Sequence, residues 1–289
     1  ILKKLYSREH QITLFTRGQN PIAHDVEHIK GDRNNLSDLQ PLKDRDFDVI
    51  IDSSGRTKQQ TENVLSFTGI PKDRFIYISS AGVYVDSTLW PLDEQSPIDL
   101  DSRHIGKFET EEFLKKEGCS FTSFRPTYIY GAGNYNPIEK WFFDRIIYNQ
   151  PIPIPGNGEI ITQLGHVNDL ADAILKSMDS QIAKNKVYNC SSSKGITING
   201  LIFSAAKACG VDPTNLNLQN FDPNILDSKA RKLFPIRTSH FFTDTNLLEN
   251  EINWKPSISL DQGLSDSYQN DYLHNNYGKP DFSNDKIFY

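Results

Sequence analysis

Residues 74–84 read RFIYISSAGVY, and this stretch decides the fold. Residues 75–78 are continuously apolar or aromatic and partly β-branched, which is typical of a strand buried on both faces of a parallel sheet. Four small residues follow at once, namely Ser79, Ser80, Ala81 and Gly82. Small residues at the carboxyl end of such a strand allow a ligand to approach the backbone. The stretch therefore predicts an α/β protein with a site at the end of this strand.

The rest of the chain alternates between predicted strands and predicted helices. Strands are expected at 11–16, 26–30, 48–52, 75–78, 121–125, 160–167 and 186–190, and helices at 36–42, 57–67, 103–116, 138–148, 168–178, 198–209 and 260–273. Strand and helix alternating at this spacing indicate a doubly wound parallel sheet with right-handed crossovers. The run PIPIPGNG predicts an edge strand or an extended crossover, because proline lacks the donor that a central strand needs.

The division of the chain is predicted from the same pattern. Residues 1–150 are expected to form a Rossmann-like nucleotide-binding domain, and residues 151–289 to complete the sheet and form a smaller substrate lobe. The opening residues ILKKLYSREH are typical of the end of an amphipathic helix. A dinucleotide-binding fold places a strand and a Gly-rich turn before that helix. Both are missing from this sequence, whose one methionine is Met178, and we expect them in the parent gene.

Composition restricts the classes of partner. The formal net charge is −6, so no global positive field attracts phosphate or an anionic membrane, and nucleic acid would have to bind at a local patch. The cysteines Cys119, Cys190 and Cys209 are typical of a reduced intracellular protein, not of a disulfide framework or a zinc site. No apolar run approaches the roughly twenty residues that cross a bilayer. We therefore expect no membrane association.

Candidate cofactor contacts follow the ends of several strands. Arg17 is basic where a 2′-phosphate would lie, which favours NADP-like chemistry; a solvated arginine beside a turn is the alternative. Asp32 and Arg33 either flank an adenine or form an Asx-type turn. Ser53 and Arg125, which follow or end two further strands, and Lys107, as a contact to the nucleotide ribose, complete the predicted cofactor set.

Three strings, SSAGVY, RPTYIYG and HVNDLADAI, together resemble the extended short-chain dehydrogenase/reductase superfamily. The longer strings SRHIGKFETEEFL, SFRPTYIYGAGNYNPIEKWFFDRI and PIPIPGNGEIITQLGHVNDLA resemble one atypical branch, the chloroplast stem-loop binding proteins and their cyanobacterial relatives. The resemblance covers nearly the whole chain. It implies RNA binding, association with ribosomes and transcripts, divalent-metal-dependent endoribonuclease activity with Mg²⁺ as the expected metal, and a location in chloroplast stroma or cyanobacterial cytoplasm.

The redox chemistry of that superfamily uses Ser, Tyr and Lys, the last two spaced as Tyr-x-x-x-Lys so that the amine lowers the pKa of the phenol. Ser80 and Lys107 match the motif, but Arg103 occupies the tyrosine position. A guanidinium does not deprotonate in proteins and suits a phosphate or carboxylate instead. Arg103 therefore argues against hydride transfer, unless Tyr84 or His104 replaces the phenol. Plain surface roles are the alternatives for Arg103 and Lys107.

A basic run supplies candidate RNA contacts. The stretch SKARKLFPIRTSH contains Lys229, Arg231, Lys232 and Arg237, which would contact phosphate oxygens; a solvated basic loop is the alternative. The aromatic residues of 138–148 either stack on bases or pack in the core, and their helical spacing favours the core.

No residues have clear metal-ligand spacing. His166 and Asp169 come nearest, but their place at a strand-to-helix turn favours a structural role, with Asp169 supporting the helix start. Magnesium can be held largely by water and phosphate, so its protein ligands are unassigned.

Two main functional hypotheses result. The chain is an RNA-binding, RNA-cleaving member of the atypical branch, or it is an NADP-dependent epimerase or reductase of a nucleotide sugar. A non-catalytic scaffold that forms homo-oligomers through exposed helices is the third hypothesis. The tail from Asn275 is expected to be poorly ordered.

Overall fold

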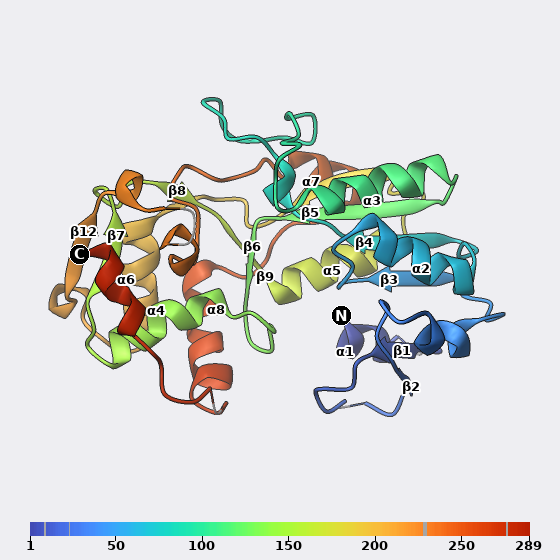
Figure 1. Cartoon of the computed structure of the whole chain (residues 1–289), viewed down its shortest axis with the longest axis horizontal. Helices are drawn as coiled ribbons and strands as arrows, with labels where there is room; N and C mark the ends of the chain where they lie inside the picture. Colours follow the sequence, from blue (N-terminus) through green and yellow to red (C-terminus); the bar gives the residue numbers. More distant parts are fainter. Residues whose placement is uncertain (9, 23, 228–229, 276) are drawn as a thin grey trace.

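The computed structural model describes residues 1–8, 10–22, 24–227, 230–275 and 277–289. Its centre is a parallel sheet in the order β10-β5-β4-β3 (Figure 1). The four strands are β3 (Val49–Asp52), β4 (Arg74–Ile78), β5 (Phe121–Pro126) and β10 (Lys186–Cys190). The strand predicted from residues 74–84 is therefore an interior strand of this sheet, as expected.

Helices cover both faces of the sheet. They are α2 (Lys58–Thr68), α3 (Ile105–Lys116), α5 (Val167–Met178) and α7 (Asn246–Ile252). The side chains of β4 alternate between the two faces. Phe75 and Tyr77 pack with Leu114 of α3, whereas Ile76 packs on the opposite side with Ile174 of α5. This is the doubly wound arrangement that the apolar run of β4 predicts.

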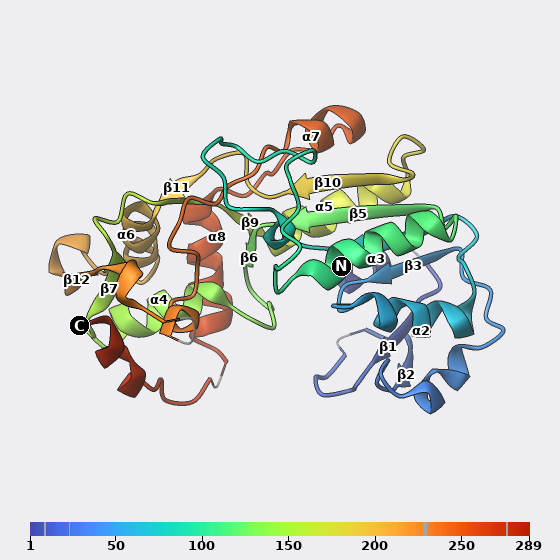
Figure 2. The same ribbon diagram turned by 45° about the horizontal axis from the view of Figure 1, so that its top comes forward.

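A second parallel pair lies on the β3 side of the main sheet (Figures 1 and 2). It consists of β1 (Thr13–Thr16) and β2 (Glu27–Lys30), as predicted from 11–16 and 26–30. Phe15 and Ile29 pack on the 3-10 helix η1 (Leu36–Leu42) and on Val64 of α2. The N-terminal helix α1 (Leu2–Tyr6) contacts α5, where Lys4 Nζ lies 2.5 Å from Asp172 Oδ1. The pair is therefore attached mainly through helices.

The largest hydrophobic cluster lies at the other end of the molecule (Figure 1). Its helices are α4 (Ile138–Ile147), α6 (Ile198–Ala208) and α8 (Leu260–Ser267), the last continuing as the π-helical turn η6 (Tyr268–Tyr272). β7 (Ile152–Pro155) pairs in parallel with β12 (Leu218–Phe221), so the edge strand predicted from PIPIPGNG is confirmed. α4 precedes residue 150 but packs here, and β10 follows residue 150 but completes the main sheet. The division at residue 150 stays a prediction.

Three predicted boundaries are wrong for identifiable reasons. The strand expected at 160–167 is two short strands, β8 (Ile161–Thr162) and β9 (Leu164–His166), which pair with β11 (Ile196–Thr197) and β6 (Tyr128–Tyr130). Gln163 separates them because its side chain bonds to Thr243 N and Ser192 O. α5 begins at Val167, not at 168, because His166 caps it and its Nδ1 accepts from Asn168 N. The third boundary is the start of α3, described below.

The end of the chain is packed, contrary to the expected poor order. The helix η7 (Ser283–Phe288) places Phe288 in the largest cluster, only 2% exposed. Asp285 of the same helix receives a hydrogen bond from Arg145 Nη2 at 2.6 Å. An aromatic anchor and an ion pair therefore hold this segment. In the described part of the chain, every helix is too short or too polar to span a bilayer.

Candidate functional site

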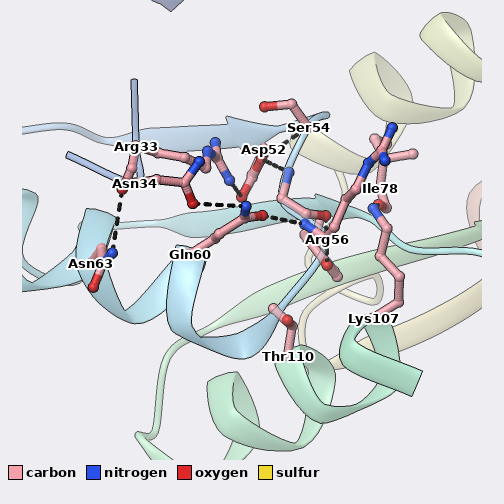
Figure 3. A network of polar contacts seen from close by, with 12 residues as sticks. Arg33, Asn34, Asp52, Ser54, Arg56, Gln60, Asn63, Ile78, Lys107 and Thr110 are labelled. Carbon is pink, nitrogen blue, oxygen red and sulfur yellow. Dashed lines mark hydrogen bonds and ion pairs between the residues drawn. The ribbon is translucent and has the colours of Figure 1, made fainter. Parts of the chain in front are cut away.

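Ser80 and Lys107 both lie at the carboxyl end of β4. Ser80 caps the short helix η2 (Ala81–Val83), and its Oγ accepts a hydrogen bond from Gly82 N at 3.0 Å. Lys107 Nζ donates to Ile78 O at 2.6 Å (Figure 3) and lies 4.9 Å from the centroid of the Tyr77 ring. The side chain of Lys107 therefore reaches from α3 back to the end of the strand.

The ammonium group of Lys107 is poorly hydrated. Burial lowers the pKa of Lys107 to about 8, and the charges of Arg56 and Arg33 act in the same direction, while Asp52 and Glu111 oppose them. An ordinary lysine has a pKa of about 10.4. Lys107 is therefore partly neutral at mildly alkaline pH.

α3 begins at Ile105 with His104 as its N-cap residue, so the expected start at Arg103 is wrong. Ser102 Oγ donates to Gly82 O at 2.7 Å and accepts from His104 N at 3.1 Å. These bonds hold the preceding turn against η2 instead of continuing the helix. Arg103 consequently lies ahead of the helix, and the helical i, i+4 relation to Lys107 does not apply to it.

His104, not Arg103, packs against the end of β4. A Cβ on Gly82 would lie 2.5 Å from His104 Cδ2 and 3.0 Å from Ser80 Oγ, so glycine is required here. Arg103 Nε donates to His104 Nε2 at 3.0 Å, which requires a neutral imidazole. Burial, followed by the positive charges of four neighbours, lowers the pKa of His104 to about 4. These neighbours are Arg103, Arg237, Lys107 and Arg56.

Tyr84 lies in a buried network and is not brought to Ser80. Its side chain is 1% exposed, and its hydroxyl donates to Asn189 Oδ1 at 2.8 Å and accepts from Arg125 Nη1 at 3.1 Å. Burial raises the pKa of Tyr84 to about 12, which makes proton transfer from this phenol unfavourable. The structure therefore corrects the expectation that Tyr84 replaces the missing catalytic phenol.

Arg125 belongs to the same network, although the sequence predicted a cofactor contact. Its Nη2 lies 2.5 Å from Glu111 Oε2, and both residues are buried. Ser123 Oγ donates to the other oxygen of Glu111 at 2.8 Å. The guanidinium of Arg125 thus joins β5 to α3 inside the protein, where a dinucleotide would not reach it.

Arg33 is also paired within the chain. Its Nη1 lies 2.7 Å from Asp52 Oδ2 at the end of β3 (Figure 3). Asp52 Oδ1 accepts from Ser54 N and Gly55 N, at 3.0 Å and 2.8 Å. The buried carboxylate therefore organises the loop after β3, while the neighbouring Ser53 is exposed.

Replacing Asp52 is expected to remove one source of acid sensitivity. Burial opposes its ionisation, but Arg33 and the loop N–H groups more than compensate, so the pKa of Asp52 is below its usual range. Because the folded-state pKa is depressed, this stabilisation is present above about pH 4 and is lost as the pH falls further.

We expect Asp52→Asn to lower the free energy of unfolding by about 1–3 kcal/mol at pH 7 and by less near pH 3. Denaturant unfolding at the two pH values measures both. An equal loss at pH 3 and pH 7 would contradict the assignment.

Asp32, which follows β2, forms the Asx-type turn that was one of the two alternatives predicted from the sequence. Asp32 Oδ1 accepts from Asn34 N at 2.9 Å, which is an Asx-type turn. This bond lowers the pKa of Asp32, with a smaller contribution from the charge of Arg17. Arg17 is exposed. These residues gather at the strand ends, but their cofactor role stays a prediction.

The predicted basic cluster is divided in the structure. Lys229 lies outside the described residues. Arg231 and Lys232 are exposed on η5 (Ala230–Leu233), where Arg231 Nε donates to Leu226 O at 3.1 Å. Arg237 instead reaches the end of β4, because its Nη2 donates to Gly82 O at 3.2 Å and its Nη1 lies 3.0 Å from Asp86 Oδ1. Arg237 therefore joins the site around His104.

The aromatic helix and the nearest metal-like pair are structural, as the plainer alternatives predicted. Phe142 and Phe143 of α4 are buried in the largest cluster. Asp169 accepts hydrogen bonds from Ser257 N and Oγ, at 3.0 Å and 2.9 Å. Within the described ranges, no group of three His, Cys, Asp or Glu residues could hold a metal ion.

Sequence reasoning missed Arg56. It is exposed directly after Gly55, in the loop that Asp52 organises. The available signal was the string IIDSSGR, in which an arginine follows the small residues at a strand end. Its closeness to Lys107 and His104 results from the packing of that loop on α3, where a Cβ on Gly106 would lie 2.6 Å from Arg56 O.

Comparison with known proteins first defines the class. The sequence model of the NAD dependent epimerase/dehydratase family matches residues 1–191. The UDP-glucose 4-epimerase of Thermotoga maritima is 17% identical with a TM-score of 0.74, covering 92% of each chain. RMD from Pseudomonas aeruginosa, solved with NADPH, is 19% identical with a TM-score of 0.67, covering 88% of this chain and 96% of that one. These structures show the fold alone, a Rossmann-like parallel α/β sheet as predicted.

The sequence also has a much more similar relative. The chloroplast stem-loop binding protein of 41 kDa b from Arabidopsis thaliana is 39% identical over 301 aligned positions, covering 98% of this chain and 79% of that protein. The chain therefore belongs to the NAD dependent epimerase/dehydratase family and, within it, to the family of chloroplast stem-loop binding proteins. The resemblance seen in its sequence strings is confirmed.

The residues present fit only part of the family's cofactor chemistry. Proteins of this family bind NAD(P). The cofactor contact expected of Lys107 stays a prediction. The hydroxyls of the tyrosines around the site have other partners, which are Gly55 O for Tyr77, Asn189 for Tyr84 and Arg237 N for Tyr128. Tyr77 and Tyr84 donate their hydroxyl protons within the protein, so neither takes the place of the motif's phenol.

Proposed function

We propose that this protein binds stem-loop RNA and does not catalyse hydride transfer. The observation that carries the proposal is Arg103, a permanent cation that takes the place of the proton-donating phenol in the sequence motif and is hydrogen-bonded to His104. The relative named for stem-loop binding supports RNA as the ligand. A scaffold that has replaced its proton donor with a guanidinium is better suited to phosphate than to a sugar hydroxyl.

The family resemblance extends the proposal to RNA cleavage. We propose Mg²⁺-dependent endoribonuclease activity in which water and RNA phosphates supply most of the metal's ligands, since magnesium keeps several waters in most protein sites. We also propose that the protein associates with ribosomes and their transcripts and that it forms homo-oligomers. Its expected location is the chloroplast stroma or the cyanobacterial cytoplasm.

An NADP-dependent epimerase or reductase is the second candidate. Lys107 and Ser80 favour it, because both remain at the end of β4 where the superfamily uses them. Arg17 would face the 2′-phosphate of NADP, and Asp32 and Arg33 would flank its adenine. In this case, His104 would have to donate the proton. A pKa of about 4 makes the protonated imidazole scarce at neutral pH.

One titration separates the two candidates. The protein is titrated with stem-loop RNA and with NADPH, with and without Mg²⁺, and nucleotide-sugar turnover is followed. We expect RNA binding whose affinity falls steeply with salt, because each neutralised phosphate contributes about 0.7–0.9 to the logarithmic salt slope. NADPH should not be oxidised with any nucleotide sugar. EDTA should stop RNA cleavage while leaving binding measurable.

Turnover of a nucleotide sugar, lost in His104→Ala, would instead establish the reductase. A lack of any RNA binding at low salt would refute the proposed function. RNA degradation that persists in EDTA would refute the metal-dependent cleavage alone.

A further inference from the structure

We propose that RNA phosphates bind along the carboxyl edge of the main sheet, at five basic side chains that we call the edge cluster. Its members are Arg33, Arg56, Arg103, Lys107 and Arg237. This inference rests on the proposed RNA-binding function and assigns that function a surface. The surface differs from the basic run at 229–237 that the sequence predicted, with which it shares only Arg237.

The members come from distant parts of the sequence but lie around one spot. Arg33 and Arg56 follow β2 and β3, Lys107 is on α3, and Figure 3 shows all three at the same strand edge. Arg33 and Arg56 act electrostatically on Lys107. Arg56, Lys107, Arg103 and Arg237 all act on His104. Contacts agree with this: Arg103 Nε bonds to His104 Nε2, and Arg237 Nη2 bonds to Gly82 O, beside which His104 packs. The loop that carries Arg56 packs on Gly106, the residue before Lys107.

The edge cluster has more positive than negative charge. Arg33 is paired with Asp52, and Arg237 with Asp86. For Arg56, Arg103 and Lys107, no ion pair is found in the part of the chain that the structure describes. Three uncompensated cations therefore lie together on a protein whose net charge is −6. A local positive region of this kind attracts polyanions even when the whole molecule is acidic.

The chemistry of the members favours phosphodiester groups. Arg56 and Arg103 are exposed, so their planar forks are accessible without any rearrangement. A guanidinium can bind two phosphate oxygens at once, whereas an ammonium acts as a point charge. The edge cluster presents several cations rather than one, which suits an RNA strand with several phosphates.

Lys107 makes the binding sensitive to pH. It faces Asp52, Glu111, Arg33 and Arg56, and it packs over the Tyr77 ring. A bound phosphate adds negative charge beside an amine that burial and cations otherwise deprotonate. Phosphate binding should therefore be accompanied by proton uptake at Lys107 and should weaken as the pH rises past 8.

Matched charge variants test the surface. Arg56→Gln/Arg103→Gln removes two members, and Lys115→Gln/Lys116→Gln removes the same charge from the exposed last turn of α3. We expect the edge variant to bind stem-loop RNA at least about tenfold more weakly at 0.1 M salt, with the salt slope reduced by about 1.4–1.8. The control should change affinity less than about twofold. A third variant, Arg231→Gln/Lys232→Gln, represents the surface predicted from sequence.

Loss of binding in this third variant, with the edge variant unchanged, would overturn the proposal while leaving RNA binding established. Circular dichroism and thermal unfolding show that each variant is folded before binding is compared. Since Arg56 and Arg103 are exposed, a folding defect is not expected from their replacement.

Binding of a small anion tests the proposed phosphate site independently of RNA binding. Inorganic pyrophosphate is titrated by calorimetry into the intact protein at pH 7 and pH 9, in buffers of different ionisation enthalpy. We expect more proton uptake than in Lys107→Met, which reports the ionisation of pyrophosphate itself, and up to about tenfold weaker binding at pH 9 relative to the same variant. If pyrophosphate binds in this way but stem-loop RNA does not, the anion site stands and the proposed function fails. If pyrophosphate does not bind, or binds equally to Lys107→Met, the edge cluster is not a phosphate site.

Discussion

Arg125→Met is expected to lower the free energy of unfolding by about 3–5 kcal/mol. The substitution leaves the Glu111 carboxylate buried, 2% exposed, without its cation. It also removes the donor to the Tyr84 hydroxyl. An uncompensated buried charge costs more than the pair itself contributes, because desolvation is no longer offset. Denaturant unfolding should show a lower midpoint with an unchanged slope.

Two further variants distinguish this mechanism from general loss of packing. Arg125→Met/Glu111→Leu removes both charges and should recover most of the lost stability. Arg45→Met breaks an exposed pair with Glu27, at 2.6 Å, and should cost less than about 1 kcal/mol. If the double variant is no more stable than Arg125→Met, the buried pair is not what stabilises this region.

The second large effect is expected for Asp169→Ala, at about 3–4 kcal/mol. The buried carboxylate of Asp169 accepts from Ser257 N and Oγ, and from Ile258 N at 3.2 Å. Trp254 Nε1 donates to the backbone oxygen of the same residue at 3.1 Å. Asp169 therefore ties the N-terminal turn of α5 to the segment that leads into α8. Removing the carboxylate leaves Ser257 N, Ser257 Oγ and Ile258 N without their acceptor, although the bond from Trp254 to the backbone oxygen remains.

The same helix contains its own control. Asp172, one turn further along α5, pairs with Lys4, and both side chains are partly exposed. Asp172→Ala should cost less than about 1 kcal/mol, because solvent screens exposed pairs. Equal losses for Asp169→Ala and Asp172→Ala, measured by thermal or denaturant unfolding, would mean that the bonds to 257–258 contribute little.

Much of the fold follows from local pattern. The apolar run of β4 predicted an interior strand, and the PIPIPGNG run predicted an edge strand. Both inferences depend on neighbouring residues only, since proline removes a donor wherever it stands and a doubly buried strand needs apolar side chains on both faces. The resemblance to the family could also be recognised from the sequence, because each string that carries it is contiguous.

The candidate site was only partly predictable. Lys107 Nζ bonds to Ile78 O, two residues before Ser80, because the two positions are set by β4 and α3. The start of α3 was predicted wrongly, since Ser102 is held by Gly82, a residue twenty positions earlier. Arg56 was missed because its neighbours His104 and Lys107 are on another element.

The sequence by itself determined the alternation of strands and helices, the central position of β4 and the replacement of the catalytic phenol by Arg103. Only the tertiary structure decided which charges are paired. Arg125 and Arg33 both follow strand ends, yet each bonds to a carboxylate of another element, whereas Arg237 leaves the basic run to join the edge cluster. The reason is that periodicity acts over a few residues, while the partner of a charged group depends on contacts between distant segments.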